Sequence, residues 1–132
     1  MILRSCLAAL LALGAIQAAQ AGMTAEEFDA FTRGKTLYFS ENGQEYGVER
    51  YLEGRRVQWS FLDGECKDGI WYPEDGNICF IYEDLGGPQC WRFEQVPGGL
   101  AAEFMDDPEN TSRFLAYERD APMLCFGPDT GV

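Results

Sequence analysis

The sequence contains no histidine among its 132 residues. Without an imidazole, the chain has no Ser-His-Asp or Cys-His catalytic group, no His-ligated zinc and no C-x-x-C-H haem attachment. pH sensing through histidine is excluded as well. No other pairing of a nucleophile with a base stands out, so we predict a non-enzymatic protein with no catalytic residues and no cofactor.

Basic residues are scarce. Ten lysines and arginines stand against 22 acidic residues, which gives a formal net charge of −12. Proteins that bind nucleic acid carry basic patches that neutralise phosphates, so this composition argues against a nucleic-acid partner. The same charge fits a cationic partner, but it is more typical of a protein that is simply kept soluble.

Long apolar runs are absent outside the N-terminus. Arg4 precedes the run "CLAALLALGAIQAA", and Ala19-Gln20-Ala21 forms a small-x-small cleavage site before Gly22. This pattern predicts a signal peptide over residues 1–21, with cleavage after Ala18 or Ala19 as alternatives. No later segment approaches the 20 or so apolar residues of a membrane-spanning helix.

The predicted mature chain is therefore one domain, residues 22–132, in the periplasm or secreted. Loss of Arg4 with the signal peptide changes the net charge from −12 to −13. Four of the five cysteines remain, namely Cys66, Cys79, Cys90 and Cys125. An even number of cysteines in an exported chain predicts two disulfides, which four cysteines can form in three ways. Zinc is disfavoured because the chain has neither C-x-x-C pairs nor histidine.

The mature chain opens with a helix signal. Thr24 and Glu27 have the spacing of a capping box, in which each side chain satisfies a backbone N–H group at the helix start. Phe28 and Phe31 then fall on one apolar stripe, and Gly34 is a favourable residue just beyond the helix end. These features predict one short helix over residues 25–33.

The hydrophobic period then changes from 3.6 to 2. Asn42-Gly43 and Glu53-Gly54 each lie between alternating residues, and Asn-Gly is the strongest short hairpin signal. If both loops have two residues, Phe39 pairs with Tyr46, and Val48 pairs with Trp59. Both registers then predict the same inner face: Leu37, Phe39, Tyr46, Val48, Trp59 and Phe61. The predicted outer face is Glu45, Glu49, Gln58 and Ser60.

Turn signals continue to the end of the chain. They predict further strands at residues 69–74, 77–83, 89–96, 100–104 and 113–119. About eight sequentially adjacent strands without helical crossovers make an all-β, single antiparallel meander over residues 35–127. Closure into an up-and-down barrel would remove its exposed edges. Strands of five to eight residues are shorter than the 9–11 that cross a membrane.

One hairpin of this meander suggests a disulfide pairing. A turn around residues 84–87 places Cys79 opposite Cys90, at a separation that a cross-strand bridge can span. Cys66 and Cys125 would then form the second bridge, with the other two pairings still open. In this hairpin Phe80 and Tyr82 share the inner face with Trp91 and Phe93.

The loop "MDDPENTS" holds the best candidate ligands for a cation. Asp106, Asp107, Glu109 and Asn110 offer the oxygen atoms that hard cations prefer. However, the spacing of a calcium-binding EF-hand is absent, and ordinary loops have the same composition. We therefore predict no metal site.

Several residues carry a family resemblance. Gly69-x-Trp71, Gly76, Ile78-Cys79-Phe80 and Cys90-Trp91 resemble a pattern of small exported proteobacterial β-domains of unknown function. The likeness covers residues 36–100 and implies a secreted β-domain without an assigned activity. The combination of signal peptide, small barrel, disulfide and barrel tryptophans is also similar to the lipocalin-like inhibitors of bacterial metalloproteases. In that family the N-terminal segment, here Gly22–Thr24, enters the protease cleft.

The predicted function is binding. We expect an exported β-domain that binds either a small apolar ligand inside the barrel or an envelope protein, with a protease inhibitor as the alternative. A hydrolase built on paired carboxylates is a further alternative. The candidate ligand-binding residues are the inner aromatic residues: Phe39, Tyr46, Trp59, Trp71, Phe80 and Trp91.

Overall fold

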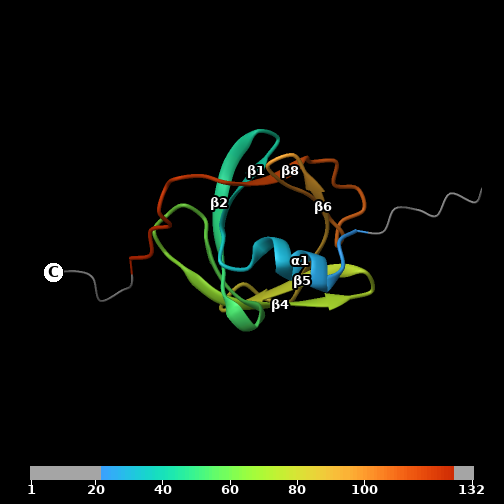
Figure 1. Ribbon diagram of the computed structural model, residues 1–132, viewed down its shortest axis with the longest axis horizontal. Coiled ribbons are helices and arrows are strands. Elements are labelled where there is room, and N and C mark those ends of the chain that lie inside the picture. Colours follow the sequence, from blue (N-terminus) through green and yellow to red (C-terminus); the bar gives the residue numbers. More distant parts are fainter. Residues whose placement is uncertain (1–21, 127–132) are drawn as a thin grey trace, which may run out of the picture.

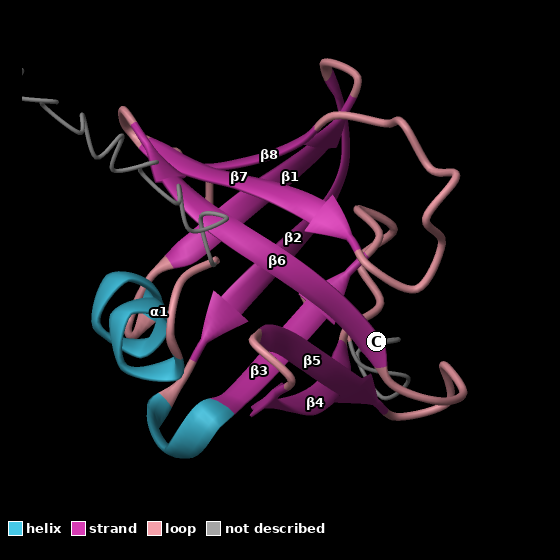
Figure 2. Ribbon diagram, turned by 90° about the vertical axis from the view of Figure 1, so that its right-hand side faces the viewer, coloured by secondary structure: helices cyan, strands magenta, loops and turns pink. Residues whose placement is uncertain are grey.

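The computed structural model describes residues 22–126, so the predicted signal peptide lies outside the described residues. Within these residues one short α-helix precedes eight strands, and the strands surround a common interior (Figures 1 and 2). In chain order the elements are α1 (Ala25–Thr32), β1 (Thr36–Glu41), β2 (Gln44–Tyr51), the 3-10 turn η1 (Glu53–Arg55), β3 (Arg56–Ser60), β4 (Lys67–Glu74), β5 (Asn77–Tyr82), β6 (Gln89–Val96), β7 (Gly99–Phe104) and β8 (Phe114–Glu118).

The eight strands form a closed antiparallel barrel. Each strand pairs with its neighbour in sequence, and β8 pairs with β1 to close the sheet. The predicted all-β, up-and-down barrel with one N-terminal helix is therefore confirmed. Closure leaves no unpaired edge strand, which removes the usual route to edge-to-edge aggregation.

Helix α1 forms as the capping box predicts. The Thr24 hydroxyl accepts the N–H of Glu27, and the Glu27 carboxylate accepts the N–H of Thr24. Gly34 follows the helix with a φ of 80°, a conformation that favours glycine.

The helix closes one end of the barrel (Figure 2). Phe28 is fully buried there, with its ring centroid 5.1 Å from that of Trp71 and 4.7 Å from that of Phe93. Burial of a phenylalanine side chain contributes about 1.5–3 kcal/mol. Phe28 therefore anchors α1 in the barrel as a plug, and the fold has one filled end.

The register of β2 differs from the prediction. Ser40 pairs with Glu45 as expected, but Phe39 pairs with Gly47 instead of Tyr46. Tyr46 is thus an extra residue, a β-bulge, and beyond it the inward and outward positions of β2 are exchanged.

The turn between β2 and β3 also shifts the strand register by one residue from the prediction, in the same direction. It is a longer loop through η1, so that Tyr51 pairs with Val57 and Glu49 pairs with Trp59. The prediction that Val48 faces inward and Glu49 outward is therefore wrong. Glu49 is only 1% exposed and lies inside the barrel, whereas Val48 lies on the outer side of the sheet.

The C-terminal segment covers the outer side of β1 and β2. Tyr38, Val48 and Met123 form a small buried cluster there, separate from the barrel core. The Tyr38 hydroxyl donates to the backbone carbonyl of Ala121, 3.0 Å away. This cover explains how an apolar Val48 is buried although it points away from the barrel interior.

Both disulfides have the pairing that the hairpin geometry in the sequence suggests. Cys79 is joined to Cys90 across β5 and β6, and Cys66 is joined to Cys125, which ties the C-terminal segment to the β3–β4 loop. None of the described helices is both long enough and apolar enough to cross a membrane.

The two disulfides are expected to stabilise the fold unequally. They join cysteines 59 and 11 positions apart, and a larger loop loses more chain entropy when it is closed. Replacing Cys66 and Cys125 by serine should lower the free energy of unfolding by about 4 kcal/mol, against about 3 kcal/mol for Cys79 and Cys90. Urea unfolding of the two double variants measures this. The reverse order would show that native-state contacts, not loop closure, set the contribution of each bridge.

Candidate functional site

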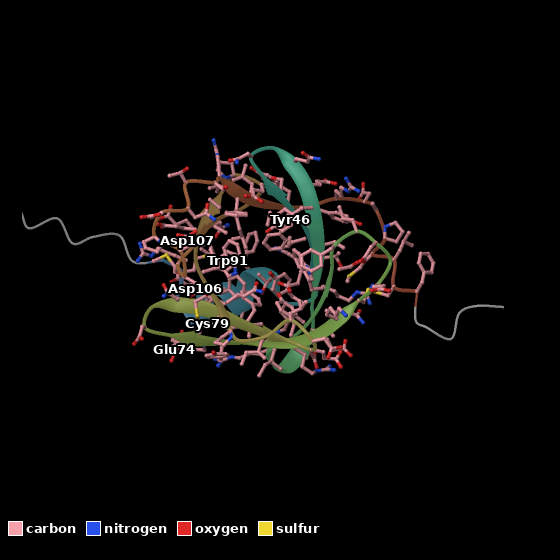
Figure 3. The ribbon with its side chains drawn as sticks, turned by 180° about the vertical axis from the view of Figure 1, so that it is seen from behind. Tyr46, Glu74, Cys79, Trp91, Asp106 and Asp107 are labelled. Carbon is pink, nitrogen blue, oxygen red and sulfur yellow. A yellow bond between two sulfur atoms is a disulfide. The ribbon has the colours of Figure 1, made fainter. Side chains whose placement is uncertain are left out.

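A cavity of about 330 Å³ occupies the barrel end opposite α1. Figure 3 shows this end, with Tyr46 and Trp91 directed into the ring of strands. Ten aromatic side chains line the cavity: Phe39, Tyr46, Trp59, Phe61, Phe80, Tyr82, Trp91, Phe93, Phe104 and Phe114. The remaining lining residues are Glu41, Glu49, Leu85, Gln89 and Asn110.

The cavity and the plug share a wall. Phe80 and Phe93 line the cavity, and their rings also contact Phe28 of α1, at centroid distances of 6.2 and 4.7 Å. Phe28 thus supports the floor of the cavity. The opposite end is surrounded by the three longer loops of the barrel, residues 61–66, 83–88 and 105–113. Such loops on a rigid barrel are where binding residues usually lie.

Trp59 forms much of one wall. Its ring lies 5.6 Å from Phe39, 5.7 Å from Tyr46 and 5.3 Å from Phe61, measured between centroids. Gly47 makes this position possible, because a Cβ atom there would come within 2.1 Å of Trp59 Cη2. The absence of a side chain directly after the bulge therefore gives the indole its place.

Glu49 is the buried charged residue of the cavity wall. The bulge turns it inward between Leu37 and Trp59, its partners on β1 and β3. The Tyr82 hydroxyl, from β5, donates a hydrogen bond to Glu49 Oε2. A buried carboxylate needs such partners, because burial of a charge without them is very costly.

Two further tyrosines surround this carboxylate. Tyr51 and Tyr46 follow and precede Glu49 on the inward side of β2. The Tyr51 hydroxyl is buried near the carboxylate but lacks a partner in hydrogen-bonding geometry among the described residues. Burial is the main cause that raises the pKa of Tyr46, Tyr51 and Tyr82, and the nearby Glu49 carboxylate adds to it. All three phenols therefore stay protonated at neutral pH.

Burial is also the main influence on the pKa of Glu49. It raises the pKa of Glu49 from its ordinary value to about 7, although the Tyr82 and Tyr51 hydroxyls act in the opposite direction. The desolvation of the charged form outweighs the hydrogen bond to it. Glu49 can therefore gain or lose its proton near neutral pH.

The structure brings five of the six nominated aromatic residues together. Phe39, Tyr46, Trp59, Phe80 and Trp91 all line the cavity. Trp71 does not. It is buried at the plugged end, with its ring against Phe28 and the Arg55 guanidinium 4.9 Å from its centre.

Sequence reasoning missed the polar part of the site. The predicted register places Tyr82 on the correct face, although the predicted site does not include it, and places Glu49 on the wrong face. The available signal was Gly47, a glycine inside a predicted strand, which often marks a bulge. Reading it as such would have turned Glu49 inward.

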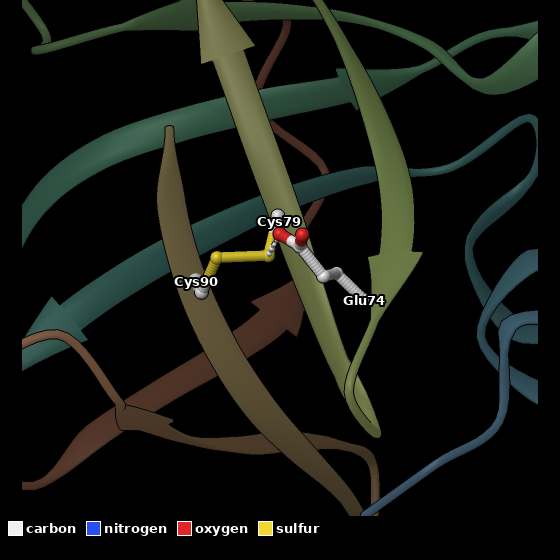
Figure 4. Close-up of side chains that lie close together, drawn as sticks. All are labelled: Glu74, Cys79 and Cys90. Carbon is white, nitrogen blue, oxygen red and sulfur yellow. Dashed lines mark hydrogen bonds between the residues drawn. A yellow bond between two sulfur atoms is a disulfide. The ribbon is translucent and has the colours of Figure 1, made fainter. Parts of the chain in front are cut away.

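The described residues hold one group with the spacing of a metal site, formed by Glu74, Cys79 and Cys90 (Figure 4). A Glu74 carboxylate oxygen lies 4.0 Å from Cys79 Sγ. Both sulfurs belong to the same disulfide, so neither is a thiolate, which is the form that binds metals. This group is therefore part of a structural bridge.

The acidic loop after β7 is engaged in local hydrogen bonds. Asp106 Oδ2 accepts the N–H of Cys90, and Asp107 Oδ1 accepts the N–H of Glu109. The Asn110 side-chain oxygen accepts the N–H of Ser112. These contacts shape the loop beside the cavity.

No family model, no curated protein and no solved structure matches this chain.

Replacement of Gly47 by alanine is expected to disturb the cavity wall. The new methyl group would overlap Trp59, and overpacking of this kind costs about 1–3 kcal/mol. Urea unfolding and tryptophan emission report the loss of stability and the displaced indole. As a control, Gly87 has open space at its Cβ position, so Gly87→Ala should leave both unchanged. Equal behaviour of the two variants would contradict the role given to Gly47.

Glu49 should make stability depend on pH. In the unfolded chain this acid titrates near its ordinary pKa of about 4.3, and in the folded protein near about 7. The folded state thus binds the proton more tightly, so the stabilisation is complete below pH 4 and is lost as pH rises to about 7. Replacement by glutamine, which mimics the protonated acid, removes this dependence.

We therefore expect Glu49→Gln to match the wild type near pH 4. Above pH 7 the variant should be more stable by on the order of 3 kcal/mol. Chemical unfolding of both proteins from pH 4 to 8 measures the difference, in which the titration of all other groups cancels. A difference independent of pH would mean that Glu49 keeps an ordinary pKa.

Proposed function

We propose that this protein is a non-enzymatic binding protein that takes up one small, mainly apolar ligand at the open end of its barrel. The observation that carries the proposal is the aromatic cavity above the α1 plug. Eight strands enclose an interior that is either filled by side chains or holds one small ligand. Here Phe28 fills one end, and a volume of about 330 Å³ is left at the other.

The size and chemistry of the cavity fit a small molecule. Its volume lies at the lower end of the range of small-molecule sites, about 300–1,000 Å³. Such sites combine many apolar groups with a few polar ones that orient the ligand. Ten aromatic rings supply the first, and Glu49 with Tyr82 supplies the second.

An exported location is part of this proposal. The two disulfides are consistent with an oxidising environment, because such bridges persist in the periplasm and outside the cell. The predicted signal peptide and the likeness to small exported β-domains point to the same compartment. The binding proposal holds whether the protein is periplasmic or secreted from the cell.

Inhibition of a protease by the N-terminal segment has less support. The N–H of Met23 donates to the carbonyl of Phe93, 2.8 Å away, and the Met23 side chain packs against the barrel core. An inhibitor that inserts Gly22–Thr24 into a protease would first have to break these contacts. The cavity needs no such rearrangement.

The binding of octanol tests the proposal. Octanol is neutral and small, and burial of its alkyl chain should give a Kd on the order of 0.1 mM. Calorimetry measures it, and emission from Trp59 and Trp91 should change on binding. Gln89 lines the cavity, so Gln89→Trp should fill it and weaken binding at least tenfold.

The matched control uses the outer face of the same strand. Glu94 is exposed on β6, and Glu94→Trp adds the same ring without entering the cavity. This variant should bind octanol as the wild type does. Equal weakening in both variants, or no octanol binding by the wild type, would overturn the proposal.

A further inference from the structure

The charged groups of the cavity are all of one sign. Among the described residues that line it, only Glu41 and Glu49 are ionisable at ordinary pH, and none is a lysine or arginine. A carboxylate or phosphate ligand would thus enter a low-dielectric space without a counter-ion, which is strongly unfavourable. A cationic ligand would instead meet a carboxylate already in place.

The loops around the open end carry the same sign. Residues 61–66, 83–88 and 105–113 contain seven aspartates and glutamates and a single basic residue, Arg113. In Figure 3, Asp106 and Asp107 lie on the same side of the barrel as Trp91. A mouth with such an excess of negative charge raises the local concentration of positively charged ligands.

The aromatic walls are also suited to a cation. Trp59 and Trp91 line the cavity together with Tyr46, and the faces of such rings attract ammonium groups within about 6 Å of the ring centre. The cation–π contacts of the described residues engage other rings, those of Phe31, Trp71 and Tyr38. Within residues 22–126, no lysine or arginine forms such a contact with a ring of the cavity.

Glu49 has hydrogen-bonding capacity left. Among the described residues the Tyr82 hydroxyl donates to Oε2, and the Tyr51 hydroxyl lies near the carboxylate but outside hydrogen-bonding geometry. An ionised carboxylate accepts several hydrogen bonds over its two oxygens. An ammonium group can therefore bind this carboxylate without displacing Tyr82.

From this charge pattern we infer that the ligand is an organic cation, an apolar molecule with a protonated amine, and that Glu49 is its counter-ion. The inference rests on the proposed function and specifies the class of its ligand. A bare metal ion fits less well, since hard cations need six or more oxygen ligands and ten of the fifteen lining residues are aromatic.

Three probes with one alkyl chain test the inference: octylamine, octanol and octanoate. Their affinities are measured by calorimetry with the full protein at pH 8, where the amine is protonated and Glu49, with a pKa of about 7, is ionised. We expect octylamine to bind at least tenfold more tightly than octanol. Octanoate should bind more weakly than octanol.

Glu49→Gln separates the charge from the cavity. In this variant octylamine should bind no more tightly than octanol, and continued binding of octanol shows that the cavity persists. Glu94→Gln is the control for an exposed carboxylate outside the cavity, and it should change octylamine binding less than threefold. Retention of the tenfold preference in Glu49→Gln would overturn the assignment of the counter-ion.

A pH comparison in the wild type is independent of any variant. At pH 5 Glu49 is protonated and octylamine remains charged, so the preference for octylamine over octanol should fall at least fivefold from its value at pH 8. The groups that face Glu49 are Tyr46 and Tyr51 on its own strand, Tyr82 on β5, and the uncharged Leu37 and Trp59 on β1 and β3. None of these titrates between pH 5 and 8. Glu41, the remaining acid of the lining, is controlled by repeating the comparison in Glu41→Gln.

The outcomes distinguish the inference from the function on which it rests. If octanol binds and octylamine binds no better, the ligand is not a cation, and the proposed apolar cavity stands. If none of the three probes binds, both proposals are overturned. If octanoate binds best, the negative lining does not govern selection and the inference is wrong.

Discussion

The single extra residue at Tyr46 in β2 determines the character of the barrel interior. Without that bulge, Val48 would point inward and Glu49 outward, and the interior would be almost entirely apolar. With it, Glu49 lies beside Trp59 inside the barrel, and Val48 is buried on the outside under the C-terminal segment. Gly47 is part of the same arrangement, because the Trp59 indole occupies the space that a side chain there would need.

The interior is filled differently at the two ends of the barrel. At one end Phe28 packs against Trp71 and Phe93, and this aromatic cluster supplies burial that a small domain needs for stability. At the other end the aromatic rings line a cavity and leave the interior unfilled. The buried Glu49 lowers stability at neutral pH in its ionised form, because the charged carboxylate loses its hydration.

Much of the fold follows from local sequence signals. The Asn42-Gly43 turn, the capping box at Thr24 and the spacing of Cys79 and Cys90 each depend on residues close together, and each forms as predicted. The inward side of β5 and β6 was also predicted, because that hairpin has no bulge. Trp71 is predicted in the site as an aromatic residue of the barrel interior. It does lie in the interior, but at the plugged end, because the level of a residue along the barrel axis depends on the positions of all eight strands.

What the sequence determined is the succession of hairpins, the helix, and the two disulfides once one of them is assigned, because these depend on turn geometry and period-2 patterning within short segments. What only the tertiary structure decided is the bulge at Tyr46, the inward turn of Glu49, and the division of the interior into a plug and a cavity. A register shift of one residue changes no local preference. It is selected because Trp59 fits over Gly47 and because the C-terminal segment covers Val48, and these contacts join parts of the chain that meet only in the closed barrel.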